Sequence, residues 1–333
     1  MSLKSRTHFL AKVYLQSTGT CVGPDEHQGP LGNYFDHYFE DYYGHEKTFE
    51  KAERKMQQYA IKKCLQKIKM DEEEIDLFIS GDLTNQITCS SYNAREFDVP
   101  YLGIYGACSS SCLGLAIASL LVEGGFFENI LVSVSSHNAT AERQYRYPVE
   151  YGIQKPETTT FTATGCGAAI LSNQKSEIQI ECITLGRVVD LNQTNVNDMG
   201  RAMAPAAYDT LKAHFADTSR SFKDYDLVVT GDLSYYGKQI LVEMLKEENQ
   251  ETDNYNDCGL MLYDISKQDV FLGGSGCACS ALVTFGYLVE EMKKGRYKKV
   301  LVVATGALMS PITIMQKESI PAVAHAISLE VKS

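Results

Sequence analysis

One internal repeat constrains the fold of this chain more than any other feature. Asp76–Thr84 reads DLFISGDLT and Asp226–Ser234 reads DLVVTGDLS, with five identical positions and like-for-like exchanges at the others. Gly125–Ser135 and Gly295–Thr305 form a second related pair at a slightly larger offset, which indicates an insertion in the second half. A repeat of about half the chain length is far too long for a solenoid. We therefore expect two copies of one unit, related by pseudo-two-fold symmetry, with the functional cleft where they meet.

Each half alternates short β-branched segments with helical patterns, which is typical of a mixed sheet with helices on both faces. We place the division between residues 1–172 and 173–333. The first half is expected to contain strands at Phe9–Gln16, Leu77–Ser80, Leu102–Tyr105, Ile130–Ser135 and Ala168–Ser172, and helices at Glu50–Ile68 and Ser109–Glu123. The second half is expected to contain strands at Glu177–Arg187, Leu227–Thr230, Gly259–Tyr263, Val300–Thr305 and Ala324–Val331, and helices at Gly200–His214, Lys238–Glu248 and Cys279–Lys294.

The helix expected at Ser109–Glu123 is apolar around most of its circumference, which predicts burial between layers. The segment after Gly276 is similarly small and apolar, so the two helices should pack together at the molecular centre. Asn138–Thr164 lies between the repeated segments and shows no clear period. It is too long for a simple connection and is interpreted as a functional loop or a dimer contact.

Charge and composition exclude several classes of protein. The formal net charge of −11 argues against a nucleic-acid partner and against unaided binding to an anionic membrane. Met1–Leu15 mixes charged and apolar residues and does not resemble a signal peptide, and the apolar stretch Leu113–Val122 is too short to span a bilayer. Ten cysteines without an export signal indicate synthesis in the cytoplasm and free thiols.

Cys108 lies where a predicted strand ends and the buried helix begins. The positive end of a helix dipole favours a thiolate, and a nucleophilic cysteine is built in this way. The alternative is a small buried residue in a tight strand-to-helix turn, because cysteine is often found in protein cores.

The segment from Ala107-Cys108 through the central helix and Gly125 to Ser135 resembles the thiolase superfamily, especially its initiating ketoacyl synthases. This resemblance implies a duplicated five-layer αβαβα fold, with two pseudo-symmetric mixed sheets around central helices. In that family the cysteine is acylated, and the second half supplies a histidine together with a second histidine or an asparagine. Here the corresponding turns, Gly231–Gly237 and Gly273–Cys277, contain neither histidine nor asparagine. The resemblance therefore implies the scaffold without its acid–base residues, and we expect no enzymatic activity.

Further local sequences resemble the stage V sporulation protein AD family over essentially the whole chain. They are Ser135–Ala139, Arg143–Gly152, Gln154–Pro156, Thr305–Pro311 and Glu318–Pro321. The resemblance implies a protein of spore-forming bacteria that binds dipicolinic acid (pyridine-2,6-dicarboxylate), without another cofactor, and helps to load it into the developing spore. It also implies integral-membrane partner proteins and a peripheral position at the inner membrane of the forespore. Dipicolinate could be bound as its calcium chelate.

Such a planar aromatic dianion requires guanidinium groups, hydroxyls and flat apolar faces. Arg143 and Arg146 could bind its carboxylates, although both could instead form ion pairs at a dimer interface. Tyr145 and Tyr147 could stack on the ring or donate hydrogen bonds to it. The remaining ligand-binding residues that we expect are Cys108 itself, the helix-start residues Ser109 and Ser110, and His137. The serines could alternatively cap the helix, and His137 could be a structural histidine.

Metal sites are weak alternatives in this sequence. Cys108, Cys112, Cys277 and Cys279 could meet at the centre, but their spacings are not those of usual zinc ligands, so we expect no metal site. Asp82 and Asp232 end equivalent strands and could meet a calcium ion, although accepting backbone N–H bonds in the following turn is the more ordinary role. The three histidines of the aromatic segment near Gly29–Gly44, which are His27, His37 and His45, are interpreted as part of a surface flap over the cleft.

Two rival functions follow from the same residues. An acyl-transferring condensing enzyme could use Cys108 with His137 or His325 as an unconventional base. A docking subunit of a spore membrane complex could instead use Tyr34–Tyr43 and Tyr145–Tyr151 as its contact surface. We also expect a homodimer in solution.

Overall fold

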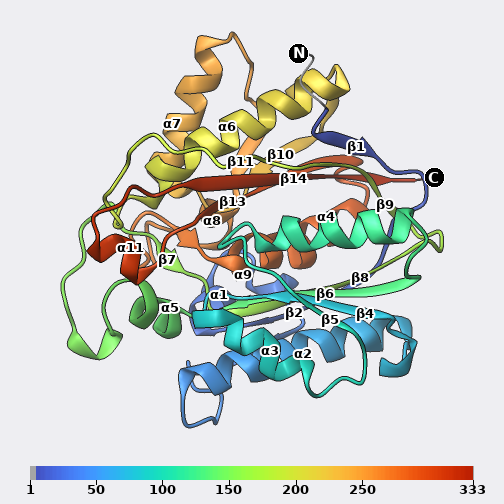
Figure 1. Ribbon diagram of the computed structural model, residues 1–333, viewed down its shortest axis with the longest axis horizontal. Helices are drawn as coiled ribbons and strands as arrows, with labels where there is room; N and C mark the ends of the chain where they lie inside the picture. Colours follow the sequence, from blue (N-terminus) through green and yellow to red (C-terminus); the bar gives the residue numbers. More distant parts are fainter. Residues whose placement is uncertain (1–4, 333) are drawn as a thin grey trace.

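The computed structural model describes residues 5–332 and consists of five layers (Figure 1). Helices α6 (Met199–Thr218) and α7 (Ser234–Glu247) cover one half of the sheet, and α2 (Phe49–Ile68) and α3 (Thr88–Ala94) cover the other. Central helices lie between the two halves of the sheet. The predicted αβαβα fold class is therefore confirmed. Of the segment Met1–Leu15, residues 1–4 lie outside the described residues.

The two halves of the sheet repeat one topology. The first half has the strand order β2 (Tyr14–Val22), β8 (Gly165–Ser172), β6 (Asn129–Ser136), β4 (Leu77–Gly81) and β5 (Tyr101–Gly103). The second half has the order β9 (Ile178–Thr184), β14 (Ala322–Val331), β13 (Lys299–Ala307), β10 (Leu227–Thr230) and β11 (Tyr255–Asp257). In each half the first two pairings are antiparallel and the last two are parallel.

The two half-sheets are joined rather than separate. A short antiparallel pairing of β2 with β9 links Tyr14 to Gln179 and Leu15 to Ile178, so one sheet runs through the molecule and folds over the central helices. The chain passes from β8 to β9 in the turn where we placed the division between the halves. Strand β1 (Thr7–Phe9) pairs with β9, so the beginning of the described chain extends the second half-sheet.

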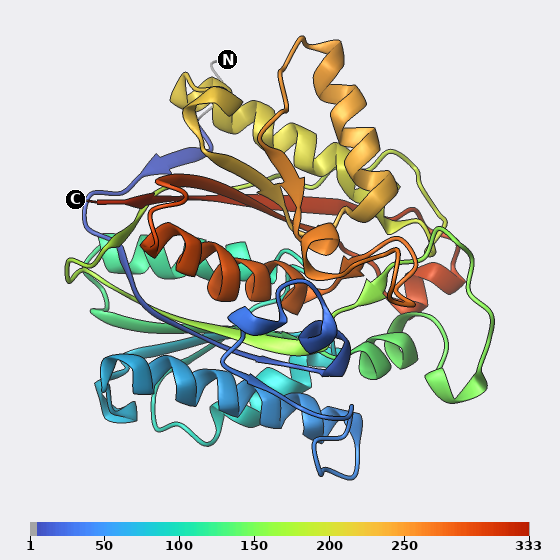
Figure 2. The same ribbon diagram turned by 180° about the vertical axis from the view of Figure 1, so that it is seen from behind.

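The central layer contains α4 (Ser110–Glu123) and a continuous helical segment formed by α9 (Cys277–Leu282), the π-helical turn η6 (Val283–Leu288) and α10 (Val289–Lys293). Figure 2 shows this second segment between the two sheet layers from behind. Buried residues of both helices belong to one hydrophobic cluster with the inner faces of the sheet. The prediction that two buried helices meet at the centre is therefore correct.

Three predicted elements differ from the structure. The strand expected at Gly259–Tyr263 is instead helix α8 (Cys258–Leu262), because the Asp257 side chain accepts a hydrogen bond from the Gly259 N–H and caps a helix there. The strand expected at Phe9–Gln16 is interrupted between β1 and β2, and the loop expected at Asn138–Thr164 contains helix α5 (Asn138–Tyr145). The other predicted strands and helices have the predicted type, with shifts at their ends.

Short elements complete the described chain. They are α1 (Pro24–Gln28), η1 (Gly32–Tyr34), β3 (His37–Tyr38), η2 (Glu72–Glu74), η3 (Asn85–Ile87), η4 (Val149–Tyr151), β7 (Phe161–Thr162), η5 (Phe222–Asp224), β12 (Gly274–Ser275) and α11 (Pro311–Met315). Strands β7 and β12 pair with each other and bring the two halves together beside α5.

Candidate binding site

Cys108 lies in a tight turn between β5 and α4, at the junction of the two halves. The preceding residue, Ala107, has a positive φ of 48°, which side chains other than glycine seldom adopt. Ser109 Oγ donates to the Gly106 carbonyl at 2.6 Å and Ser110 Oγ donates to the Ala107 carbonyl at 2.7 Å. The N–H groups of both serines are also bonded to these two carbonyls. Ser109 and Ser110 therefore stabilise the turn, and neither lines the cavity described below.

The Cys108 thiol faces a carboxyl group rather than an imidazole. The Asp232 carboxyl group, which belongs to the other half of the molecule, lies near enough to the thiol to oppose its ionisation. Burial, the neighbouring Asp232 and the neighbouring Cys277 together raise the pKa of Cys108 well above the usual thiol value. This environment opposes formation of the thiolate that a nucleophilic cysteine requires.

Asp232 is buried in the second half of the molecule, beside Cys108 of the first half. Its carboxyl group accepts hydrogen bonds from Thr305 Oγ1 at 2.6 Å and from the Gly276 N–H at 3.1 Å. Burial raises its pKa to about 7. Its counterpart in the repeat, Asp82, instead accepts hydrogen bonds from the Thr84 and Ser90 N–H groups of its own turn. This is the structural role that the sequence predicted for Asp82.

Neither histidine of the condensing-enzyme hypothesis lines the cavity beside Cys108. His137 caps α5, because its Nδ1 accepts from the Ala139 N–H at 3.2 Å and its Nε2 donates to the Tyr42 carbonyl at 2.8 Å. His325 Nδ1 accepts from the Gly186 N–H at 3.2 Å. Burial lowers the pKa of each of these two imidazoles to about 4. The structure therefore gives His137 a structural role and does not bring it to Cys108.

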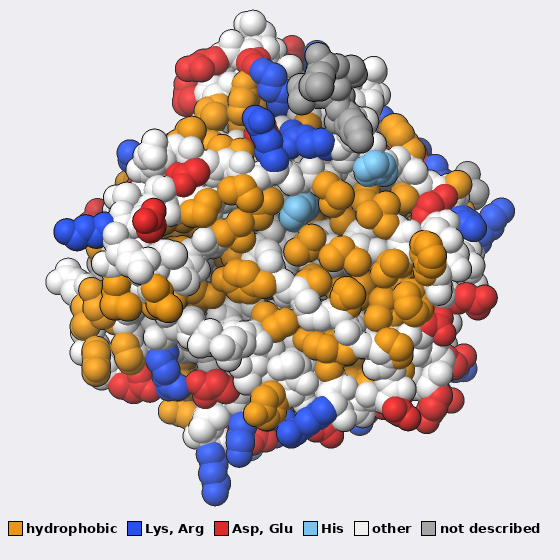
Figure 3. All heavy atoms as spheres, viewed as in Figure 1, with side chains coloured by type: hydrophobic (Ala, Val, Ile, Leu, Met, Phe, Trp, Pro, Cys, Tyr) orange, Lys and Arg blue, Asp and Glu red, His pale blue; other side chains and the backbone are white. Residues whose placement is uncertain are grey.

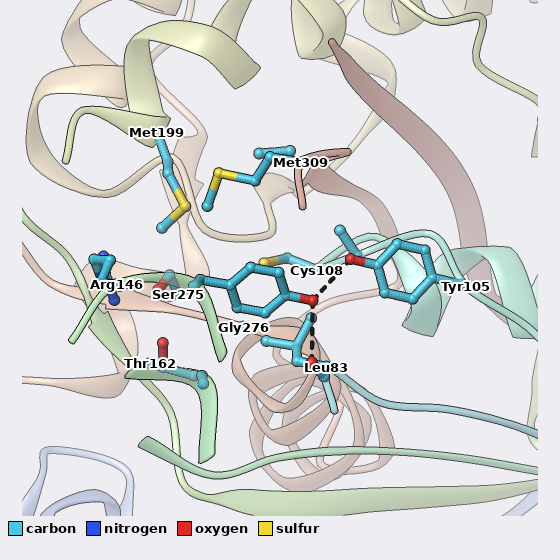
Figure 4. A pocket seen from close by; sticks show the side chains of 13 residues that line it. Leu83, Tyr105, Cys108, Arg146, Thr162, Met199, Ser275, Gly276 and Met309 are labelled. Carbon is cyan, nitrogen blue, oxygen red and sulfur yellow. Dashed lines mark hydrogen bonds between the residues drawn. The ribbon is translucent and has the colours of Figure 1, made fainter. Parts of the chain in front are cut away.

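A cavity lies over Cys108 between the two halves, open to solvent at its mouth. Figure 4 shows Met199 and Met309 on one side, Leu83 opposite them, and Tyr105 at one end. Arg146, Ser275 and Thr162 lie together at the other end, with Cys108 between the two ends. The walls are mostly apolar, and the full lining also includes Ala107, Ala141, Tyr145, Gly276 and Ala307.

Two buried polar groups in this lining have no hydrogen-bond partner, namely Arg146 Nη1 and Ser275 Oγ. The rest of the Arg146 guanidinium is bound to Glu142, with Nε at 3.2 Å and Nη2 at 2.5 Å from the carboxylate oxygens. Lys155 Nζ lies 3.1 Å from the same carboxylate. Two cations therefore share one anion, which leaves one net positive charge beside the cavity. Because an unpartnered buried donor is costly, this end of the cavity is suited to an anionic ligand.

The other predicted ligand-binding residues are only partly brought together. Tyr145 lines the cavity, and its hydroxyl bonds to the Leu83 carbonyl at 3.0 Å and to the Tyr105 hydroxyl at 2.9 Å. Arg143 is half-exposed outside the cavity, where it pairs with Glu50 and Glu150. Tyr147 is exposed and follows Arg146 out of the cavity. Of the predicted ligand-binding residues, the structure places Cys108, Tyr145 and Arg146 along one cavity, whereas the sequence did not indicate Asp232, Ser275 or the two methionines.

Residues 5–332 contain no group of three or more His, Cys, Asp or Glu side chains placed to hold a metal ion. The four cysteines of the zinc alternative instead form separate contacts, such as the Cys277 thiol that donates to the Ala107 carbonyl at 3.0 Å. The segment near Gly29–Gly44 does not cover the cavity, because His27 stacks on Tyr38 and His37 stacks on Tyr59 away from its lining. The prediction of a flap over the cleft is therefore wrong.

Comparison with solved structures shows that the chain has the thiolase-like fold of ketoacyl synthases. It superposes on 3-oxoacyl-[acyl-carrier-protein] synthase III from Aquifex aeolicus VF5 with a TM-score of 0.60, covering 96% of this chain and 99% of that chain at 15% identity. A variant of OleA from Xanthomonas campestris bound with cerulenin gives a TM-score of 0.61, covering 98% of this chain and 99% of that chain at 14% identity. At these identities the likeness shows the fold alone.

Sequence comparison shows the family. The family model for stage V sporulation protein AD matches residues 4–330. Stage V sporulation protein AD from Bacillus subtilis (strain 168) is 48% identical over 319 residues, which are 96% of this chain and 94% of that protein. The chain therefore belongs to the stage V sporulation protein AD family, whose members are sporulation proteins. Within residues 5–332, no helix has both the length and the apolar character needed to cross a membrane.

Proposed function

We propose that this protein binds dipicolinate in the cavity over Cys108 and takes part in its uptake into the developing spore. The observation that carries the proposal is the buried Arg146 Nη1, which has no partner and lines the cavity beside Ser275. A ligand carboxylate would accept hydrogen bonds from both groups and would meet the net positive charge of the Arg146, Lys155 and Glu142 cluster.

The apolar walls suit the flat pyridine ring of this ligand. Met199 and Met309 have flexible, polarizable side chains that can adjust to a planar ring, and Tyr145 adds an aromatic wall. One net positive charge does not neutralise a dianion. We therefore propose that dipicolinate binds as its calcium chelate, in which the metal ion offsets the remaining charge.

The same site supports binding rather than acyl transfer. A thiol with a raised pKa and without an imidazole beside it cannot readily form the attacking thiolate. Intact-protein mass spectrometry after incubation with acyl-CoA thioesters tests this assignment, and no adduct is expected. A stable acyl adduct that disappears in Cys108→Ala would overturn the non-catalytic proposal.

Isothermal titration of dipicolinate, with and without calcium chloride, tests the binding proposal. A charge-assisted hydrogen bond is worth about 1.5–3 kcal/mol, so Arg146→Lys should weaken binding by about tenfold to a hundredfold. Ser275→Ala should weaken it by a smaller factor. Arg143→Gln is the matched control, because Arg143 lies outside the cavity, and its affinity should stay within about twofold of the wild type. Absence of binding in both titrations, or equal losses in Arg143→Gln and Arg146→Lys, would refute the proposal.

We further propose that the protein is a homodimer and works with integral-membrane partners at the inner membrane of the forespore. The strand β5 is the last of its half-sheet and carries the exposed Leu102, while Leu120 on α4 and Phe126 after it are exposed as well. Figure 3 shows hydrophobic side chains gathered over α4 on this face. Unpaired edges and large apolar patches are typical of interfaces. Light scattering should give the mass of a dimer, and Phe126→Ser with Leu120→Ser should shift it towards the monomer.

A further inference from the structure

The end of the cavity opposite Arg146 carries a pair of tyrosine hydroxyls. Tyr105 and Tyr145 both line the cavity, and their hydroxyl oxygens lie 2.9 Å apart. The Tyr145 hydroxyl oxygen also lies 3.0 Å from the Leu83 carbonyl oxygen. Figure 4 draws both bonds as dashed lines beside the labelled Tyr105 and Leu83. The three oxygens therefore form a row that runs from the Leu83 carbonyl to Tyr105.

The direction of each hydrogen bond in this row follows from the Leu83 carbonyl, which can only accept. Because a tyrosine has a single hydroxyl proton, the proton of Tyr145 must lie on its bond to Leu83. The Tyr145 oxygen then accepts the proton of Tyr105. Burial raises the pKa of Tyr105 to about 12, so its hydroxyl stays protonated at neutral pH. Tyr105 is therefore the donor at the free end of the row.

The Tyr105 proton can be redirected to a ligand at low cost. Taking the Tyr145 proton away from the buried Leu83 would leave a carbonyl group without a donor, which is costly. Taking the Tyr105 proton away from Tyr145 removes one donor from a hydroxyl that still donates to Leu83. A hydrogen bond to a carboxylate is also stronger than a bond between two neutral hydroxyls. A carboxylate that reaches this end should therefore receive the hydrogen bond of Tyr105.

The two ends of the cavity differ in charge. Among the residues that line the cavity in the described part of the chain, Arg146 alone is charged. It lies with Ser275 and Thr162 at the end away from Tyr105 (Figure 4). A ligand with one carboxylate would bind at the Arg146 end and leave Tyr105 bonded to Tyr145. The Tyr105 hydroxyl therefore matters only for a ligand that has a second carboxylate.

We infer that Tyr105 is a specificity-determining residue, which donates a hydrogen bond to the second carboxylate of a planar ligand and so favours dicarboxylates over monocarboxylates. This inference rests on the proposed function and adds the residue that selects the class of ligand. The hydroxyl exchanges a neutral hydrogen bond for a charge-assisted one, which favours the dicarboxylate by about tenfold. A residue that only supported the cavity wall would affect both classes of ligand equally.

Isothermal titration with matched pairs of ligands tests the inference, with and without calcium chloride. The pairs are dipicolinate with picolinate and isophthalate with benzoate, and the second member of each pair lacks one carboxylate. Tyr105→Phe should weaken dicarboxylate binding by about tenfold and change monocarboxylate binding by less than about twofold. Tyr147→Phe is the matched control and should change neither, because Tyr147 does not line the cavity. Each ligand is compared with itself across the variants, so differences in ligand charge and calcium binding cancel.

The possible outcomes separate the inference from the proposed function. Equal losses for both members of a pair, or dicarboxylate binding that is unchanged in Tyr105→Phe, would overturn the inference and leave dipicolinate binding as proposed. A Tyr105→Phe protein that does not fold would also overturn it, because the proton assignment leaves the Leu83 carbonyl bonded in this variant. Isophthalate binding that depends on the Tyr105 hydroxyl, in a protein that does not bind dipicolinate, would refute the proposed function and support the inference. Absence of binding for every ligand would refute both.

Discussion

Replacing Asp232 by asparagine should convert Cys108 from an inert thiol into a more acidic one. Two like charges about 4 Å apart at an effective dielectric constant of about 20 interact by about 4 kcal/mol, which corresponds to about three pKa units. After burial, the neighbouring Asp232 is the largest cause of the raised pKa of Cys108, so its carboxylate opposes the thiolate. Its pKa of about 7 means that this repulsion acts mainly above neutral pH. We therefore expect Asp232→Asn to lower the pKa of Cys108 by about two to three units.

The assay is the pH dependence of the reaction of Cys108 with methyl methanethiosulfonate, with the modified cysteine located by peptide mass spectrometry. Asp82→Asn is the matched control, because Asp82 occupies the equivalent place in the repeat and bonds to Thr84 and Ser90 instead. It should leave the rate at Cys108 unchanged, and Cys108→Ser should remove the signal. Circular dichroism checks that each variant is folded. A folded Asp232→Asn protein that reacts no faster than the wild type would refute the reasoning.

Two further predictions concern stability. Burial raises the folded-state pKa of Glu26 to about 7, above its unfolded value. The contribution of Glu26 to the stability of the folded protein is therefore present at low pH and is lost as pH rises through about 7. The free energy of unfolding should therefore fall by about 1.4 kcal/mol between about pH 6 and about pH 8.5. Thermal unfolding should show a decrease in Tm over this range, and the decrease should be smaller in Glu26→Gln. An equal decrease in the variant would contradict the raised pKa of Glu26. A Cβ atom at Gly19 would lie 2.1 Å from the Ala60 carbonyl oxygen of α2. Gly19→Ala should therefore destabilise the protein by about 1–3 kcal/mol in urea unfolding. At Gly152 a Cβ would meet open space, so Gly152→Ala should destabilise the protein only through the strain of the positive φ at this position.

The repeat carries most of what the sequence reveals about the fold. Identical DLxxxGDL segments became the equivalent strands β4 and β10, and the two apolar segments became the central helices, because periodicity and burial are properties of local sequence. The wrong predictions concern segments whose local sequence is compatible with both a strand and a helix. Gly259–Tyr263 is apolar enough for a strand, but the Asp257 side chain caps a helix at its start.

The site was less predictable than the fold, because it depends on which partner each polar group finds in three dimensions. Arg143 and Arg146 look alike in the sequence, yet one pairs with surface glutamates and the other is buried with one free nitrogen. One feature of the sequence could have distinguished Arg146, because it lies four residues after Glu142 and this spacing favours an ion pair on one helix. No pattern indicated that Ser275 would line the same cavity as Arg146, since they come from different halves.

The turn after β10 offers no position at which a single substitution could place a histidine opposite Cys108. Gly231 has no room for a side chain, because a Cβ there would lie 3.0 Å from Ala304 Cα and 3.1 Å from the Thr305 nitrogen. The next position is Asp232, which bonds to Thr305 and to the Gly276 N–H. Leu233 is buried in the core of the second half.

Ser234 completes this turn with a positive φ of 55°, and its hydroxyl donates to the Gly274 carbonyl at 2.7 Å. The N–H groups of Leu233 and Ser234 are held by Asp257, at 2.9 Å each, so Asp232 is not needed to cap its own turn. It is free to face the sulfur across the junction. Each of the four positions that could carry an imidazole is therefore already committed to packing or to hydrogen bonds within the second half. Restoring a condensing enzyme would require rebuilding this turn together with β11, which is why we regard the cavity as a binding site.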